Sequence, residues 1–153
     1  QMLPAHWDAV KAIYLQWIAT KQATFQTEAR LESRDKHHLS HLRYVSLSNG
    51  VITDWAALTP VSGRCVYAGV TEISINIHED YRGKGIRKIL LQKLINETEK
   101  ENICTLQAVI FPENLPSILL HEKLAFRKVR LEKRLEKWME FGGIRCLWNV
   151  EVK

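Results

Sequence analysis

A strand followed directly by a glycine turn and a helix constrains the fold of this chain most strongly. From Thr71 to His78, isoleucines alternate strictly with polar residues, which is the period of a half-buried β-strand. Two glycines in the segment Tyr81–Gly85 end this pattern. From Ile86 to Glu101 the apolar residues recur at helical spacing. The sequence therefore predicts a strand, a tight turn and a helix in direct succession.

The other patterns predict a mixture of helices and paired strands. An apolar stripe at helical spacing runs from Ala5 to Thr20, and a weaker, more polar helical pattern covers Glu28–Arg43. Asn49-Gly50 supplies the positive-φ residues of a tight hairpin turn. The further predicted elements are strands at Tyr44–Leu47, Val51–Leu58, Cys104–Phe111, Phe126–Leu135 and Gly142–Val152, and a helix at Ser117–Leu124. Near the end of the chain, Leu131, Leu135 and Trp138 would also suit a helix. Hairpin strands with only one or two crossovers favour the α+β class.

Composition restricts the class of protein further. The 153 residues, 46% hydrophobic and 25% charged, are typical of one globular domain, and neither a linker nor a repeat divides 1–153. Three scattered cysteines form no Cys-x-x-Cys pair, so neither a disulfide framework nor a zinc cage is expected. The neighbouring His37, His38 and His41 lack an obvious further ligand, so no metal is expected. Without a long apolar run or a signal-like start, we expect a cytoplasmic protein with no membrane contact.

The glycine turn has the features of a phosphate site. Glycines at 83 and 85 let the backbone approach a ligand, and the first N–H groups of the following helix attract an anion. A net charge of +5 suits either a nucleic acid or a phosphate-bearing small molecule. The spacing fits neither a Walker loop nor the dinucleotide fingerprint, which needs a third glycine at Lys88. The alternative is that these glycines serve only the geometry of the turn.

Two longer segments in order carry a family resemblance. Tyr81–Ile86, followed by Phe111–Phe126, resembles the cofactor half of the GNAT acetyltransferase superfamily. The pieces Ile13-Tyr14, Ile18–Thr20, Ala23–Phe25, Thr27-Glu28, Trp55-Ala56, Leu58–Pro60 and Glu72–Ser74 are similar to the phosphinothricin acetyltransferase branch. The resemblance spans nearly the whole chain. It implies a GNAT fold, in which a mixed sheet of about six to seven strands is splayed in the middle and flanked by about four helices, with a short first strand.

The resemblance also implies a reaction and its partners. It implies an N-acetyltransferase that uses acetyl-CoA as donor and acetylates the primary amine of a small amino-acid-like acceptor, of the phosphinothricin or methionine-sulfone type. Many relatives dimerise, so a homodimer is expected. By the same resemblance the coenzyme-binding residues are Ile75, Ile77, Arg82, Gly83, Lys84, Gly85, Ile86, Arg87, Asn114 and Ser117. The resemblance implies that the backbone edge near Ile75 and Ile77 pairs with the amides of the pantetheine arm.

The family comparison assigns the chemical roles to two residues. Glu72 is the candidate general base for the acceptor amine, with pairing to an arginine across the sheet as the alternative. His121 stands near the expected thioester sulfur, where it either protonates the leaving thiolate or only packs.

Five further residues are expected around the acceptor. They are Phe25, Glu28, Trp55, Arg64 and Tyr67. Arg64 would bind a carboxylate and Glu28 would attract an ammonium group, whereas the aromatic residues Phe25 and Trp55 have core packing as their alternative.

The chain departs from the family pattern at identifiable positions. Arg87 stands where the superfamily has glycine or alanine, and it is expected to point outward or to pair with a phosphate. Asp54 and Ala125 replace glycines of the branch, and Ser62, Ala68 and Gly69 replace its arginine, arginine and histidine. Two rival functions remain open. One is a coenzyme-binding domain without turnover, and the other is a basic nucleic-acid-binding module using Arg127–Arg134.

Overall fold

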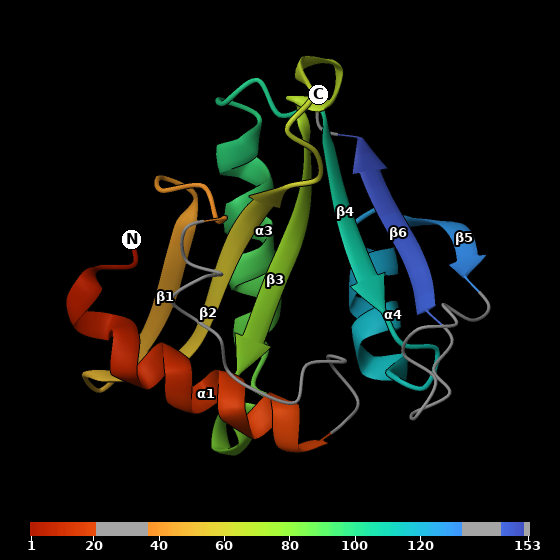
Figure 1. Ribbon diagram of the computed structural model, residues 1–153. Helices are drawn as coiled ribbons and strands as arrows, with labels where there is room; N and C mark the ends of the chain where they lie inside the picture. Colours follow the sequence, from red (N-terminus) through yellow and green to blue (C-terminus); the bar gives the residue numbers. More distant parts are fainter. Residues whose placement is uncertain (21–36, 133–144, 152–153) are drawn as a thin grey trace.

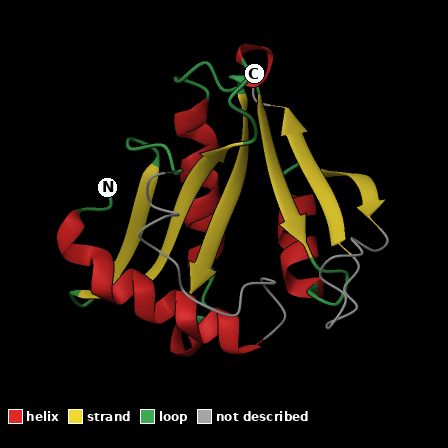
Figure 2. Cartoon of the chain, in the orientation of Figure 1, coloured by secondary structure: helices red, strands yellow, loops and turns green. Residues whose placement is uncertain are grey.

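A computed structural model describes residues 1–20, 37–132 and 145–151 of this chain, which build one sheet covered by helices on both faces (Figure 1; Figure 2). The sheet has six strands in the order β1-β2-β3-β4-β6-β5. The strands are β1 (Arg43–Ser48), β2 (Val51–Pro60), β3 (Val70–Ile77), β4 (Thr105–Ile110), β5 (Arg127–Glu132) and β6 (Arg145–Glu151). The described α-helices are α1 (Trp7–Thr20), α3 (Ile86–Thr98) and α4 (Leu115–Lys123). None of them is long and apolar enough to cross a membrane.

Most local predictions are confirmed. The α+β class is correct, and the predicted strands, the 49–50 hairpin turn and the strand–turn–helix succession all form. The described residues contain three α-helices, fewer than the expected four or so. The predicted helix Glu28–Arg43 lies outside the described residues up to 36 and is wrong beyond them. There, 37–42 form turns and bends, Leu42 is buried in the core and Arg43 begins β1, so packing outweighs a weak helical pattern.

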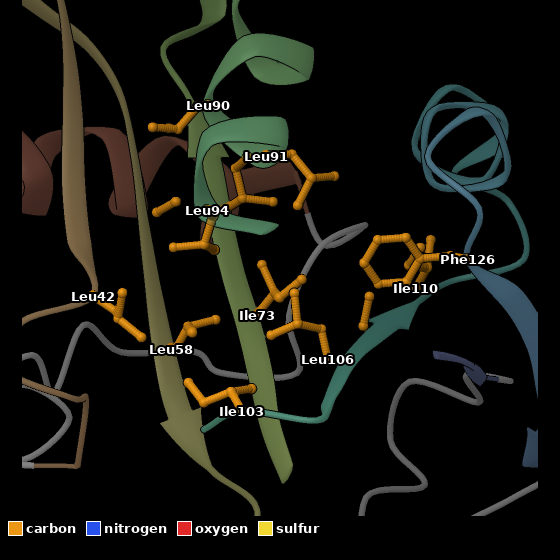
Figure 3. Close-up of a cluster of buried hydrophobic side chains, with 13 residues drawn as sticks. Leu42, Leu58, Ile73, Leu90, Leu91, Leu94, Ile103, Leu106, Ile110 and Phe126 are labelled. Atoms are coloured by element: carbon orange, nitrogen blue, oxygen red, sulfur yellow. The ribbon is translucent and has the colours of Figure 1, made fainter. Parts of the chain in front are cut away.

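Two apolar clusters hold the layers together. On one face of the sheet, Val10, Ile13 and Tyr14 of α1 pack against Trp55 and Ala57 of β2. On the other face, α3 covers the central strands, as the labelled side chains in Figure 3 show. The members of this larger cluster are Leu42, Ala56, Leu58, Ile73, Ile75, Leu90, Leu91, Leu94, Ile103, Leu106, Ala108, Ile110 and Phe126. Strict alternation along β2 sends neighbouring residues into opposite clusters, whereas β3 contributes Ile73 and Ile75 to the larger one.

The pairing between β3 and β4 is short. These two strands are parallel, whereas all other paired strands are antiparallel. Their pairing covers only three residue pairs, from Val70 with Thr105 to Glu72 with Gln107. Beyond Glu72 the two strands separate, and Figure 1 shows them side by side at one end and apart at the other. The far part of β3 therefore has an edge that β4 does not cover.

The α3 interface supplies a direct test of this packing. Leu94 is fully buried, whereas Ile89 on the same helix is 71% exposed. Leu94→Ala is expected to lower the free energy of unfolding by about 2–5 kcal/mol, because it removes apolar contacts and leaves a cavity. Ile89→Ala, the matched control, is expected to change it by less than about 0.5 kcal/mol. Urea denaturation followed by circular dichroism measures both, and equal losses in the two variants would contradict this core.

Candidate functional site

The turn between β3 and α3 leaves its backbone accessible to a ligand. After β3 the chain makes a 3₁₀ turn, Glu79–Tyr81, and reaches α3 through Gly83 and Gly85, whose φ angles are +75° and +76°. Residues other than glycine rarely adopt this backbone conformation. A Cβ atom at either glycine would meet no atom of the described residues within 4 Å, so this part of the chain leaves the space beside the turn open. Gly85 is the N-cap of α3 and offers no side-chain cap, which leaves the first N–H groups of the helix free to bind an anion.

Two exposed cations flank this turn. The guanidinium of Arg82 lies 4.4 Å from the ring centroid of Trp17 in α1, and Lys84 Nζ lies 4.6 Å from that of Tyr81. Both contacts hold a positive charge beside the glycines. The arrangement fits a multiply charged anion such as a diphosphate, as the sequence predicts.

The uncovered edge of β3 is partly occupied by the chain's own side chains. His78 N–H donates to Thr53 O of β2. The backbone N–H and C=O groups of the even-numbered residues of β3 therefore point toward β2, and those of the odd-numbered residues point toward β4. The carbonyl of Ile75 accepts from Arg87 Nη2 at 3.3 Å, and that of Ile77 from the indole of Trp17 at 2.7 Å. Arg87 therefore turns inward onto β3 and does not point outward. The carbonyls expected to pair with a coenzyme arm already have donors.

Glu72 lies at the fork where β3 and β4 separate. It is the last residue of β3 that pairs with β4, opposite Gln107, and it pairs with Thr59 of β2 on its other side. Its side chain is half-buried and points to the opposite face from Ile73, which belongs to the α3 cluster. A carboxylate at this fork can reach a group placed between the two strands, which is the position that a general base needs.

His121 of α4 is buried and electrically neutral. Its exposed fraction is 2%, and its ring lies edge-on to Phe126 with centroids 4.8 Å apart. The pKa of His121 is lowered from an ordinary value near 6.5 to about 4, because burial and the charge of Arg87 together outweigh the opposing effect of the Ser117 carbonyl. Nδ1 lies 2.7 Å from Ser117 O, which can only accept, so Nδ1 carries the proton. Nε2 is then an acceptor and finds no hydrogen-bond partner among the described residues.

Asn114 and Ser117 organise the start of α4. The Asn114 side chain caps the helix by accepting from Ser117 N–H at 3.3 Å. Ser117 is buried and its carbonyl fixes the tautomer of His121. These two predicted coenzyme residues therefore act, within the chain, on the position of His121.

The predicted acceptor residues have different surroundings. Arg64 and Tyr67 are exposed and lie next to each other, 5.9 Å from guanidinium carbon to ring centroid, in the β2–β3 connection at the Glu72 end of the sheet. Trp55 is 3% exposed and packs edge-on to Tyr14 at 6.2 Å, so it is placed as a core residue, the alternative reading of the sequence. Phe25 and Glu28 lie outside the described residues. Among the residues described, no His, Cys, Asp and Glu side chains gather into a group that could hold a metal.

Two residues near this site were not among the predicted site residues. Trp17 fits the apolar stripe of α1, and its contacts with Ile77, Arg82 and Arg87 connect it to the site. Asp54 is fully buried in β2, opposite Ile77, on the sheet face that α3 covers. A charged residue inside an otherwise apolar strand is the one sequence signal that marks it.

Known proteins share this arrangement. The chain matches the family described as Acetyltransferase (GNAT) family over residues 7–126. YwnH of Bacillus subtilis, whose name assigns it provisionally to the phosphinothricin acetyltransferases, is 37% identical over 90% of this chain and 82% of its own. The L-methionine sulfoximine/L-methionine sulfone acetyltransferase of Pseudomonas aeruginosa is 30% identical over 80% and 70%. A crystal structure of a GNAT superfamily phosphinothricin acetyltransferase from Sinorhizobium meliloti in complex with AcCoA superposes with TM-score 0.86 at 23% identity, covering 99% and 85%, which shows a common fold.

The neutral state of His121 can be tested through pH. Its folded pKa of about 4 lies below the unfolded value near 6.5, so unfolding takes up a proton between these values. The stability contributed is complete above about pH 6.5 and is lost as the pH falls toward 4. From pH 7 to pH 4.5 the wild type is expected to lose about 2 kcal/mol more unfolding free energy than His121→Gln. Denaturant titrations at both pH values measure this difference, and parallel losses would show that His121 titrates normally.

Proposed function

Because this chain belongs to the acetyltransferase (GNAT) family, we propose that it transfers an acetyl group from acetyl-CoA to the primary amine of a small amino-acid-like molecule. The observation that carries this proposal is the separation of β3 from β4 directly after Glu72, beside a helix headed by two glycines. An elongated donor with a charged diphosphate at one end and a reactive thioester at the other fits this layout. The acceptor class follows the names of the two curated relatives.

The residues around the glycine turn would hold the donor. The N–H groups of Gly83, Gly85 and Ile86 would bind its diphosphate, and Arg82 and Lys84 would add charge from the rim. The turn fits this role because the space beside Gly83 and Gly85 is open among the described residues, and because no side chain caps the start of α3. Asn114 and Ser117 would lie along the arm that leads to the thioester.

Catalysis would depend on proton removal at the fork. When bound, the coenzyme supplies an acetyl group activated as a thioester. Glu72 would accept the proton that the acceptor ammonium must lose, directly or through one water, before its nitrogen can attack. The half-buried position of Glu72 between β2 and β4 supports this role. His121, with its proton on Nδ1, would instead accept a hydrogen bond at Nε2 and position the donor.

The acceptor would approach at the Glu72 end of the sheet. Arg64 is exposed there and would pair with its carboxylate, with Tyr67 beside it. Phe25 and Glu28 complete the proposed acceptor set, Glu28 as a counter-charge for the ammonium. We also propose a homodimer, which light scattering of the purified protein tests.

One observation favours a second function, a coenzyme-binding domain without turnover. Arg87 occupies the Ile75 carbonyl, a contact expected to serve the coenzyme arm. Thermal-shift measurements with acetyl-CoA and thiol-release assays with a panel of amino acids separate the two functions. Thiol release with an amino acid supports the enzyme, whereas stabilisation by acetyl-CoA without release supports the binding domain. Steeply salt-dependent RNA or DNA binding without coenzyme binding would support the basic module instead.

Glu72→Gln is expected to lower kcat by about 10²-fold or more while changing the Kd for acetyl-CoA by less than about threefold, because the amide cannot accept the ammonium proton. Steady-state thiol release gives kcat and calorimetry gives Kd. Glu99→Gln is the matched control, since Glu99 is exposed at the end of α3, the helix on the sheet face opposite to the Glu72 side chain. An active Glu72→Gln enzyme would remove Glu72 from the role of base.

A further inference from the structure

Arg87 has an unusual place for a residue in the first turn of a helix. It is the second residue of α3, where side chains commonly reach solvent, yet its guanidinium folds back and donates from Nη2 to Ile75 O at 3.3 Å. Its Nε is buried and has no hydrogen-bond acceptor among the described residues. A guanidinium carries five donors and no acceptor. At this position it occupies an acceptor on the edge of β3, the Ile75 carbonyl, and presents N–H donors there instead.

The charges around Arg87 explain how it is held there. Asp54 is fully buried, and neither of its oxygens has a hydrogen bond within 3.5 Å among the described residues. It lies on β2 opposite Ile77, on the same sheet face as Ile75 and under the start of α3. Trp17 is the third neighbour, with its ring centroid 5.9 Å from the Arg87 guanidinium carbon. The inward position thus combines one hydrogen bond, one aromatic contact and the field of one buried carboxylate.

The pKa shifts of Arg87 and Asp54 reflect a poorly solvated place. The pKa of Arg87 is lowered to about 10, by burial first and then by the charge of Arg82, while the charge of Asp54 opposes both. Burial raises the pKa of Asp54, while Ser46 and Arg87 act to lower it. Each of the two groups stabilises the charged form of the other. Arg87 therefore keeps its charge at neutral pH.

We propose that Arg87 competes with the coenzyme arm for the edge of β3, and that Asp54 is the positioning residue that holds it in this competing place. The proposal rests on the proposed function. An amide of the arm needs the Ile75 carbonyl as acceptor for its N–H, and the Arg87 guanidinium both occupies that oxygen and presents only N–H groups of its own. Binding of the arm then requires Arg87 to leave, and the apparent affinity falls by the fraction of molecules in which Arg87 has left.

Calorimetry with acetyl-CoA tests the role of Arg87. Arg87→Ala is expected to bind about tenfold more tightly than the wild type, although it has lost a positive charge near the diphosphate site. Lys88→Ala, the matched control, removes the same charge from an exposed neighbour and is expected to bind equally or slightly less tightly. Arg87→Gln repeats the test with a longer polar side chain. Weaker binding by both Arg87 variants would overturn the proposal and make Arg87 a direct coenzyme contact.

A double-mutant cycle tests the role of Asp54. Asp54→Asn is expected to tighten acetyl-CoA binding severalfold when Arg87 is present and to have no effect in the Arg87→Ala background, because Asp54 acts through Arg87. Asp80→Asn is the control, since Asp80 has an exposed side chain in the 3₁₀ turn. An equal effect of Asp54→Asn in both backgrounds would overturn the positioning role, because a merely structural change would not depend on Arg87.

The outcomes separate this inference from the proposed function. If the wild type binds acetyl-CoA and Arg87→Ala binds no more tightly, the inference fails while the proposed function stands. If only the Arg87 variants bind, the inference is supported. If neither the wild type nor any folded variant binds at millimolar acetyl-CoA, the proposed function fails and the inference fails with it.

Discussion

The short parallel contact between β3 and β4 is the constraint on which the rest of the structure depends. Three residue pairs join the two halves of the sheet, β1-β2-β3 on one side and β4-β6-β5 on the other. Because the pairing ends at Glu72, the polar backbone of β3 beyond this point needs other partners. The chain supplies two of them itself, from Arg87 and Trp17, to the carbonyls of Ile75 and Ile77. The open edge is thus both a requirement for a bound arm and a cost that the protein must offset without one.

Local sequence patterns were sufficient to predict the elements of this fold because their causes are local. Alternation in β3, Asn49-Gly50 in the hairpin and the two positive-φ glycines before α3 depend on residues close in sequence. The end of the predicted helix at 37–43 was wrong because pairing with β2 places Arg43 in a strand. Trp55 has the same alternation in either role, and only its packing against α1, a helix distant in sequence, places it in the core.

The direction of Arg87 could not be predicted for the same reason. A first-turn arginine can extend to solvent or fold back, and the choice depends on Asp54, which is 33 positions away in sequence and brought close by the antiparallel pairing of β2 with β3. Both residues were visible as departures from the family pattern, but their connection was not, since a resemblance compares positions one at a time. The physical link is a buried carboxylate and a half-buried cation sharing one face of the sheet, where low solvation makes each charge costly without the other.

The protonation state of His121 limits the role that it would have beside the proposed thioester. A side chain that protonates a thiolate needs a proton on the nitrogen that faces it, but the Ser117 carbonyl holds the one proton of the ring on Nδ1. Adding a second proton would place a cation in a buried site near Arg87, and for this reason the pKa is low. His121 is therefore equipped to accept a hydrogen bond and not to donate one at neutral pH. In the proposed reaction, the proton for the leaving thiolate would then come from solvent or from the acceptor side, where Glu72 lies at the end of the β3–β4 pairing on the opposite face of the sheet.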